Sequence, residues 1–135
     1  MLYLLDTNII SHLMRDAEGS AARRLGDRLQ TLGACQLSTS TVVQCELLYG
    51  LQKRPSPRLQ RQYEIAMRPL LLLPLDDKVP PVYASLRAQL EAAGTLIGPN
   101  DLLIAAHALA LGATLVSADA EFQRVPGLNL ENWLN

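Results

Sequence analysis

Short apolar runs alternate along the chain with longer segments in which apolar residues recur every three or four positions. The first run, Leu2–Leu5, is too short for a helix and is typical of a strand that is buried on both faces. Asp6, Thr7 and Asn8 follow it directly and open the helical pattern of 9–14, as expected where a strand turns straight into a helix. The pattern therefore predicts Asp6 at the carboxyl end of a central strand, where open α/β sheets bind ligands.

The rest of the chain repeats this alternation. We expect further strands at 35–38, within 70–75, at 114–117 and at 128–130, and helices at 17–32, 42–51, 58–68, 80–94 and 102–111. The helices at 42–51 and 102–111 are apolar nearly all round, which predicts that both are buried. Gly33 suits the C-cap of the helix at 17–32. Strands that alternate with helices predict one α/β domain over residues 1–135, a three-layer α/β/α sandwich with a central parallel sheet.

The composition indicates a sizeable hydrophobic core and an uneven distribution of charge along the chain. The chain has 135 residues, and 49% of them are hydrophobic, which is enough for a sizeable core. Its net charge of −1 argues against a generally basic nucleic-acid binder. Residues 1–68 carry 9 Lys and Arg against 6 Asp and Glu, whereas residues 69–135 carry 3 against 7. This split can serve a polyanion on one side of the molecule and a cation on the other.

The cysteines and the N-terminus indicate where the protein resides. Cys35 and Cys45 have no metal-ligand spacing and lie among apolar residues, which favours two buried thiols in a reducing cytosol. The N-terminus has no basic stretch followed by a long apolar one, and no run is long enough to span a membrane. We therefore expect a cytoplasmic protein with no membrane contact.

Four carboxylates stand where an unpaired charge is poorly tolerated: Asp6, Glu46, Asp101 and Asp119. Asp6 and Asp119 each follow a predicted strand, and Asp101 lies in the first turn of an apolar helix. The ends of parallel strands and the starts of the helices that follow them share one edge of a sheet. We therefore expect these three residues to converge, with Glu46 reaching in from an adjacent helix.

Each carboxylate also has a simpler explanation, since Asp101 and Asp119 would serve as helix caps and Glu46 would pair with a buried arginine. Four such coincidences at one edge are less plausible than one shared cause. Like charges held close together repel unless a cation lies among them. Oxygen ligands without His or Cys favour Mg²⁺ or Mn²⁺. A metal at this position suits hydrolysis of a phosphodiester bond by a metal-activated water.

Four motifs, in this order, resemble the PIN domains and, within them, the VapC-type toxins of bacterial toxin–antitoxin pairs. The motifs are Leu4–Asn8, Glu46–Gly50, Gly98–His107 and Ser117–Phe122. The resemblance covers essentially the whole chain, including the tail at 125–133. It implies a Mg²⁺- or Mn²⁺-dependent endoribonuclease that is usually dimeric and is held inactive by a cognate antitoxin.

The resemblance also assigns roles to individual residues. Asp6, Glu46 and Asp101 match the principal acids of the family, and Asp119 matches the more variable fourth acid. The polar pair that supports the first acid is matched by Thr7 and Asn8, and Ser117 stands where Thr is common. This last difference keeps the hydroxyl group.

Two other functions stay open. An aspartyl-phosphate phosphohydrolase also needs an acid after the first strand, but such enzymes typically place a second Asp two residues on, where this chain has Asn8. A non-catalytic PIN-like binding module would be favoured by the loss of one acid, and all four are present.

The remaining candidates are a histidine and a basic stretch. His107 lies nearly two turns beyond Asp101 in an apolar helix, and we expect a hydrogen-bonded core or interface residue there rather than a general base. The basic stretch between 53 and 68, with Arg58 and Arg61 in particular, is a candidate contact for RNA phosphates or an acidic partner. A solvated helix face explains it equally well.

Overall fold

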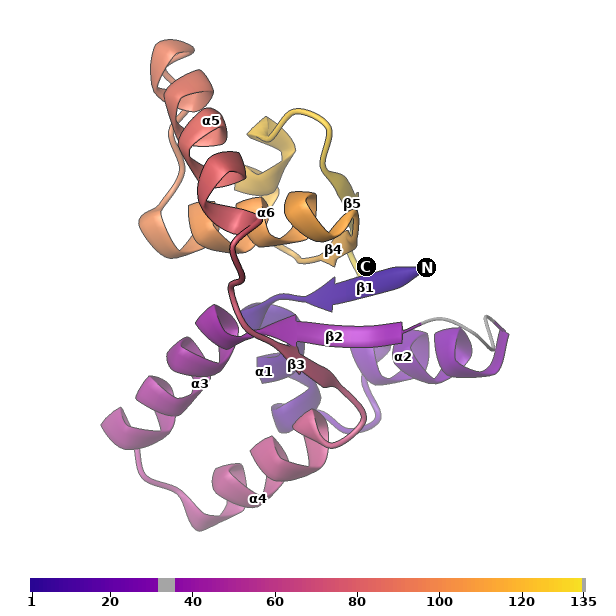
Figure 1. Ribbon diagram of the computed structural model, residues 1–135. Coiled ribbons are helices and arrows are strands. Elements are labelled where there is room, and N and C mark those ends of the chain that lie inside the picture. The colour runs from indigo at the N-terminus through magenta and orange to yellow at the C-terminus, as the bar shows by residue number, and fades with distance from the viewer. Residues whose placement is uncertain (32–35, 135) are drawn as a thin grey trace.

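The computed structural model describes residues 1–31 and 36–134 (Figure 1). The strands are β1 (Leu2–Leu5), β2 (Gln36–Ser40), β3 (Leu71–Leu73), β4 (Thr114–Val116) and β5 (Asn129–Glu131). The helices are α1 (Thr7–Arg15), α2 (Ser20–Thr31), α3 (Thr41–Lys53), α4 (Pro57–Met67), α5 (Val79–Ala92) and α6 (Pro99–Leu111), with a 3₁₀ helix η1 (Ala120–Arg124). The predicted Gly33 cap and the predicted burial of Cys35 lie outside the described residues.

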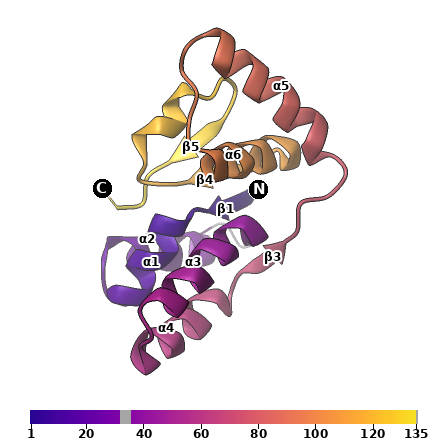
Figure 2. The same cartoon turned by 90° about the vertical axis from the view of Figure 1, so that its left-hand side faces the viewer.

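The strands form one parallel sheet in the order β3-β2-β1-β4-β5. Leu5, at the end of the central strand β1, pairs with Thr39 of β2 and Val116 of β4. In two views at right angles, α1 to α4 lie on one side of the sheet and α6, backed by α5, lies on the other (Figures 1 and 2). The predicted three-layer α/β fold is thus confirmed, and the residues that follow β1, β2 and β4 lie along one edge.

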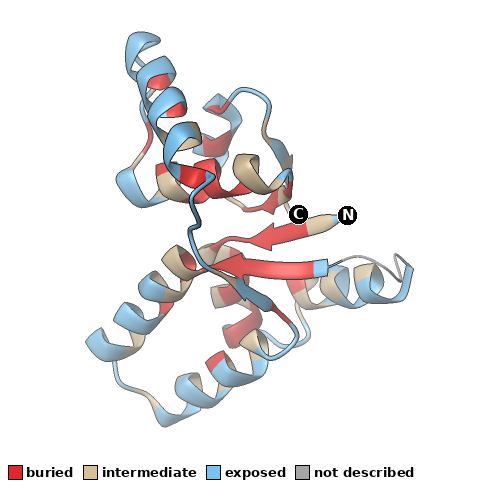
Figure 3. Cartoon of the chain, in the orientation of Figure 1, coloured by how far each residue is buried: buried red, intermediate tan, exposed pale blue. Residues whose placement is uncertain are grey.

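The prediction of a buried helix is confirmed for α6, in which six residues from Leu102 to Ala108 are buried. Gly112 ends this helix with a φ of 65°, a left-handed conformation that glycine adopts without a Cβ penalty. In Figure 3 the buried residues are concentrated in β1, β2 and β4 and in parts of α1 and α6, and their apolar side chains form one hydrophobic cluster.

For α3 the prediction of full burial is wrong. Only Val43 and Leu47 of this helix are buried, while Tyr49 is 65% exposed and Leu48 is 40% exposed. Cys45 is also exposed, which corrects the expectation of a buried thiol at this position. A helix is buried all round only if other elements cover every face, and an apolar composition does not supply those elements. Apolar side chains left in water mark a surface suited to a protein partner.

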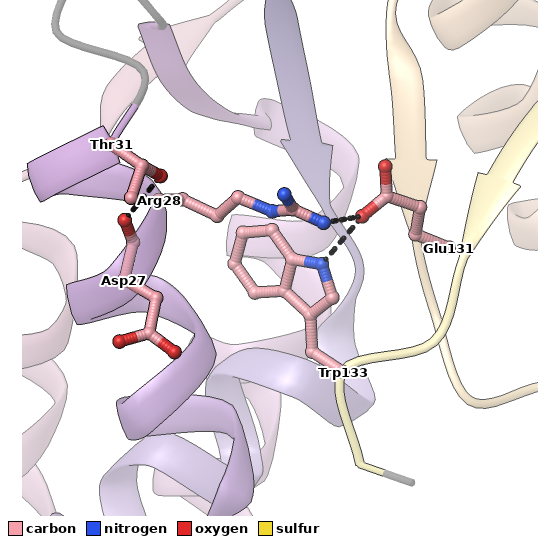
Figure 4. Close-up of polar contacts among 5 residues, drawn as sticks. All are labelled: Asp27, Arg28, Thr31, Glu131 and Trp133. Atoms are coloured by element: carbon pink, nitrogen blue, oxygen red, sulfur yellow. Dashed lines mark hydrogen bonds and ion pairs between the residues drawn. The ribbon is translucent and has the colours of Figure 1, made fainter.

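Side chains of α2 and of the segment 131–133 hold the C-terminal tail in place (Figure 4), together with Tyr3 of β1. The Arg28 guanidinium of α2 and the Trp133 indole N–H both donate to Oε1 of Glu131, at 2.9 and 3.0 Å. The same guanidinium lies 5.7 Å from the centre of the Tyr3 ring. The centres of the Tyr3 and Trp133 rings are 5.6 Å apart. These contacts tie the end of β5 to α2 and to the central strand.

Among the described residues, no helix is both long enough and apolar enough to cross a membrane.

Candidate functional site

Asp6 caps α1 and is 4% exposed at the end of the central strand. Its Oδ1 accepts the backbone N–H of Thr7 at 2.8 Å, and its Oδ2 accepts the Ser117 hydroxyl at 2.8 Å and the Asn8 amide at 3.3 Å. Burial raises the pKa of Asp6, the hydrogen bonds from Ser117 and Thr7 oppose that rise, and the charges of Glu46 and Asp119 add to it. The carboxylate is therefore fixed in position by three donors.

Asn8 and Ser117 link this aspartate to the loop that follows β4. The Asn8 amide nitrogen also donates to Ser117 Oγ at 3.2 Å, and the Asn8 side-chain oxygen accepts the backbone N–H of Ala118 at 3.1 Å. Ser117 Oγ accepts the backbone N–H of Asp119 at 3.0 Å. We call Asp6, Asn8 and Ser117 the buried aspartate network, because each of these three side chains is hydrogen-bonded to the other two.

Glu46 enters the site from α3, where it is half-buried. Its Oε1 accepts the Thr7 hydroxyl at 2.6 Å, which joins α3 to the first turn of α1. Thr7 thus contacts two acids, one through its backbone and one through its side chain. This contact explains why the half-buried Glu46 needs no arginine partner.

Asp101, Asp119 and Glu121 form a second group, which we call the open carboxylate cluster. One carboxylate oxygen from each of the three lies within 4.8 Å of the other two. Asp101 lies in the first turn of α6, while Asp119 caps η1 and accepts the backbone N–H of Glu121 at 2.9 Å. The structure therefore brings Asp101 and Asp119 together, as the sequence predicts, and adds Glu121.

The electrostatics of Asp101 connect the two groups. Partial burial, followed by the charges of Asp6, Asp119, Glu46 and Glu121, raises the pKa of Asp101 to about 6. In the part of the chain that the structure describes, no donor bonds to this carboxylate to offset the repulsion. The negative charge of the site is thus least compensated at Asp101.

Glu121 was not among the residues predicted from the sequence. Its signal was weak, because an exposed acid in the first turn of a short helix is normally explained by the helix dipole. The available clue was its spacing, since a residue two positions after the capping Asp119 lies on the same single turn.

The predicted basic stretch lies on an exposed surface. Arg58 and Arg61 are exposed on α4, and neither forms an ion pair within the described ranges. Arg54, which belongs to the same stretch, and Arg15 of α1 line a groove of about 200 Å³ whose wall includes Thr7 and Glu46. Two positively charged side chains, one at the end of α1 and one at the end of α3, therefore line the same groove as Glu46.

His107 is a core residue, as predicted. It is 1% exposed, and its Nδ1 lies 2.9 Å from Oγ of Ser40, the residue that caps α3. Burial lowers the pKa of His107. Its hydrogen bond fixes α6 against the start of α3, the helix that carries Glu46.

The open carboxylate cluster has the donor set of a site for a hard cation. All its side-chain ligands are oxygens, which Mg²⁺ and Mn²⁺ prefer. Ligands on opposite sides of a Mg²⁺ ion lie about 4 Å apart, so oxygens within 4.8 Å of one another are compatible with one shared ion. A cation there would offset the repulsion that raises the pKa of Asp101.

The fold and the acids at one edge of the sheet define a class of protein that comparison with known proteins identifies. Residues 3–128 match the PIN domain family, and this chain belongs to that family.

Its relatives within the family are VapC proteins. The chain is 38% identical to Ribonuclease VapC2 of Rickettsia felis and 34% identical to Ribonuclease VapC2 of Haemophilus influenzae, covering 98% of each chain in both cases. It superposes with a TM-score of 0.91 on a chain from the crystal structure of Rickettsia felis VapBC2 bound to a DNA fragment from their promoter. That chain is 36% identical in sequence, and the match covers 98% of this chain and 99% of that one.

Proposed function

We propose that this protein is a divalent-metal-dependent endoribonuclease and the toxin component of a toxin–antitoxin pair. The observation that carries the proposal is the concentration of acids from separate elements around Asp101. Burial, followed by the charges of these acids, raises the pKa of Asp101. Near-full-length similarity to proteins named ribonucleases supports RNA as the substrate. The intact acid set argues against a non-catalytic module, and Asn8 stands where a phosphohydrolase would place its second Asp.

The metal ligands in this proposal are Asp6, Glu46, Asp101 and Asp119, with Glu121, which shares the open carboxylate cluster with the last two, as an additional ligand. A bound Mg²⁺ or Mn²⁺ supplies an acidified water as nucleophile and positive charge against the phosphate. The chain's own residues hold the acids in place for it. Ser117 and Asn8 orient the Asp6 carboxylate, and the Thr7 hydroxyl orients Glu46.

The arginines supply the opposite charge. In this proposal, Arg15 and Arg54 bind RNA phosphates along the groove that leads to Glu46. Arg58 and Arg61 lie further out on α4 and attract the polyanion at longer range. The protein acts in the cytoplasm, where its substrate is found.

Two protein partners complete the proposal, a cognate antitoxin and a second copy of this chain. Exposed apolar side chains support them, namely Leu48 and Tyr49 of α3 and Leu71 and Leu72 of β3. Because β3 is the last strand on its side of the sheet, its leucines form an apolar edge that a partner would cover. The similarity to a chain solved as VapBC2 is consistent with an antitoxin.

The test is cleavage of single-stranded RNA and of a tRNA pool by the purified protein. We expect cleavage in Mg²⁺ or Mn²⁺, none in EDTA, and loss of at least 100-fold in rate on Asp101→Asn, since metal catalysis supplies several kcal/mol. Asp77→Asn, a change at an exposed aspartate elsewhere, is the matched control and should leave the rate unchanged. Full activity of Asp101→Asn, or activity in EDTA, would contradict the proposal.

A further inference from the structure

A second hollow lies beside the acids, on the side of β4 and β5. It has a volume of about 450 Å³, within the range of small-molecule sites. Its lining residues are Ser117, Ala118, Asp119, Ala120, Gln123, Leu130 and Asn132. Ser117 and Asp119 belong to the site already described, so this hollow, which we call the amide pocket, opens directly next to it.

One wall of the amide pocket is Asn132, which is held in a fixed orientation. Its side-chain oxygen accepts the backbone N–H of Leu134 at 2.9 Å. Its amide NH₂ has no hydrogen-bond partner among the described residues. The residues on either side are anchored, because Glu131 is bonded to Arg28 and the Trp133 ring is fully buried (Figure 4). Asn132 therefore presents a pre-positioned pair of N–H donors.

Another part of the lining is η1, which carries Gln123. Asp119 caps this short helix and the buried Phe122 anchors it, so Gln123 is held close to the metal-binding acids. The Gln123 amide is exposed and has no hydrogen-bond partner within the described part of the chain. It can both donate and accept.

The charge of the lining indicates which part of an RNA strand, phosphate or nucleobase, the amide pocket can bind. Asp119 is the one charged residue in the lining of the amide pocket, and its negative charge repels phosphate. The groove on the other side of the acids carries Arg15 and Arg54 and suits phosphate instead. Amide side chains hydrogen-bond to the edges of nucleobases, and unstacked bases of single-stranded RNA expose those edges. Leu130 adds an apolar surface for a base ring.

We propose that the amide pocket binds one nucleobase next to the cleaved phosphodiester and sets the sequence preference of the enzyme. The inference depends on the proposed ribonuclease function and deepens it. Asn132 offers donors only, so the base that it selects presents an acceptor, a carbonyl oxygen or a ring nitrogen, at the matching position.

The experiment measures cleavage of a pool of short single-stranded RNAs with random sequence in Mg²⁺, with sequencing of the cut ends. Asn132→Asp keeps the oxygen that accepts from Leu134 and replaces the NH₂ group by an acceptor, which reverses the hydrogen-bond requirement. We expect the base preference at one position near the cut to change by about tenfold, the size of a good base contact. Gln123→Ala should weaken the preference at the same position.

Asn129→Asp is the matched control. Asn129 is exposed on β5, three residues before Asn132, and does not line the pocket, so this change adds the same charge without altering the lining. Its base preferences should equal those of the unmodified protein. A second readout is binding in EDTA of the preferred and disfavoured oligonucleotides, followed by fluorescence anisotropy. Asn132→Asp should reverse their order of affinity.

Three outcomes would overturn the inference. The first is an unmodified protein that cleaves RNA with no base preference at any position. The second is that Asn132→Asp and Gln123→Ala cut more slowly on all sequences with unchanged preferences, which would make the pocket a structural support. The third is unchanged preferences with weaker binding of a co-purified protein partner, which would make it a protein-binding surface. Failure of the unmodified protein to cleave any RNA would instead refute the proposed function.

Discussion

Two groups of polar residues at the same edge of the sheet are built in opposite ways. In the buried aspartate network, the Asp6 carboxylate receives three hydrogen bonds and is almost completely shielded from water. In the open carboxylate cluster, Asp101 is partly exposed, faces four other acids and receives no hydrogen bond from the described residues. The first group is satisfied by the protein alone, whereas the second has negative charge that the protein leaves uncompensated.

This difference indicates that the two groups have different roles in the site. A carboxylate that is bonded on several sides is rigid, and it gives the site a fixed reference point. Carboxylates that repel one another are held together only by the fold, and a cation lowers their free energy. The buried aspartate network therefore has a fixed geometry, and the open carboxylate cluster is the part of the site that a bound cation would stabilise most.

The largest expected effect comes from breaking the buried aspartate network. Ser117→Ala removes the hydroxyl that donates to Asp6 and accepts from the backbone of Asp119. Because Asp6 stays buried and loses a donor, the free energy of unfolding should fall by about 1–3 kcal/mol. Urea denaturation in EDTA measures the change.

Ser85→Ala, which removes an exposed hydroxyl from α5, is the control and should change the stability by less than about 0.5 kcal/mol. Equal stability of the two variants would show that Asp6 does not depend on its donors, and the contrast between the two groups would then be wrong.

The next effect concerns the metal. Mg²⁺ at about ten times its dissociation constant should stabilise the protein by roughly 1.4 kcal/mol, from the relation RT ln(1 + [L]/Kd). Glu46→Gln keeps an acceptor for the Thr7 hydroxyl and removes one repelling charge. This variant should be more stable than the unmodified protein in EDTA and should gain less from Mg²⁺.

Thermal melts in Mg²⁺ and in EDTA make this comparison, with Glu18→Gln, a change at an exposed acid outside the site, as the control. If Glu46→Gln destabilises the protein in EDTA and retains the full Mg²⁺ gain, Glu46 is a structural residue and its place among the metal ligands is wrong.

A further effect follows from the pKa of Asp101, which is raised from its ordinary value of 3.8 to about 6. The folded protein then binds a proton more tightly than the unfolded chain does. The resulting stabilisation is complete below about pH 4 and is lost as the pH rises through about 6. In EDTA, the unmodified protein should therefore lose stability relative to Asp101→Asn between these two pH values.

The sequence predicted the fold because its strongest patterns agree with each other. The apolar run before Asp6 and the polar residues after it identified the central strand and its cap, and both are present in the structure. The burial of α3 could not be predicted in the same way. Both α3 and α6 are apolar nearly all round, but six residues of α6 are buried and only two of α3 are. Whether a helix is covered depends on where other elements pack against it. The residues of the helix alone do not determine this.

The candidate site shows the same division. Asp6, Asp101 and Asp119 were identifiable because each stands at the end of a strand or the start of a helix, and the structure brings them to one edge of the sheet. Glu121 and Arg15 were missed because each lies on an exposed helical surface, where charge is normal. Only the three-dimensional arrangement shows that Glu121 faces Asp101 and that Arg15 lines a groove with Glu46.

The most direct test of the open carboxylate cluster is an NMR titration of the aspartate side-chain carboxyl carbons in ¹³C-labelled protein, with Asp101→Asn used to assign the Asp101 signal. Without divalent cations, Asp101 should titrate with a pKa of about 6. Saturating Mg²⁺ should lower this pKa, because a cation favours the charged form. An Asp101 pKa near 3.8 in the metal-free protein, or a raised pKa that Mg²⁺ does not change, would contradict a cation site at this cluster.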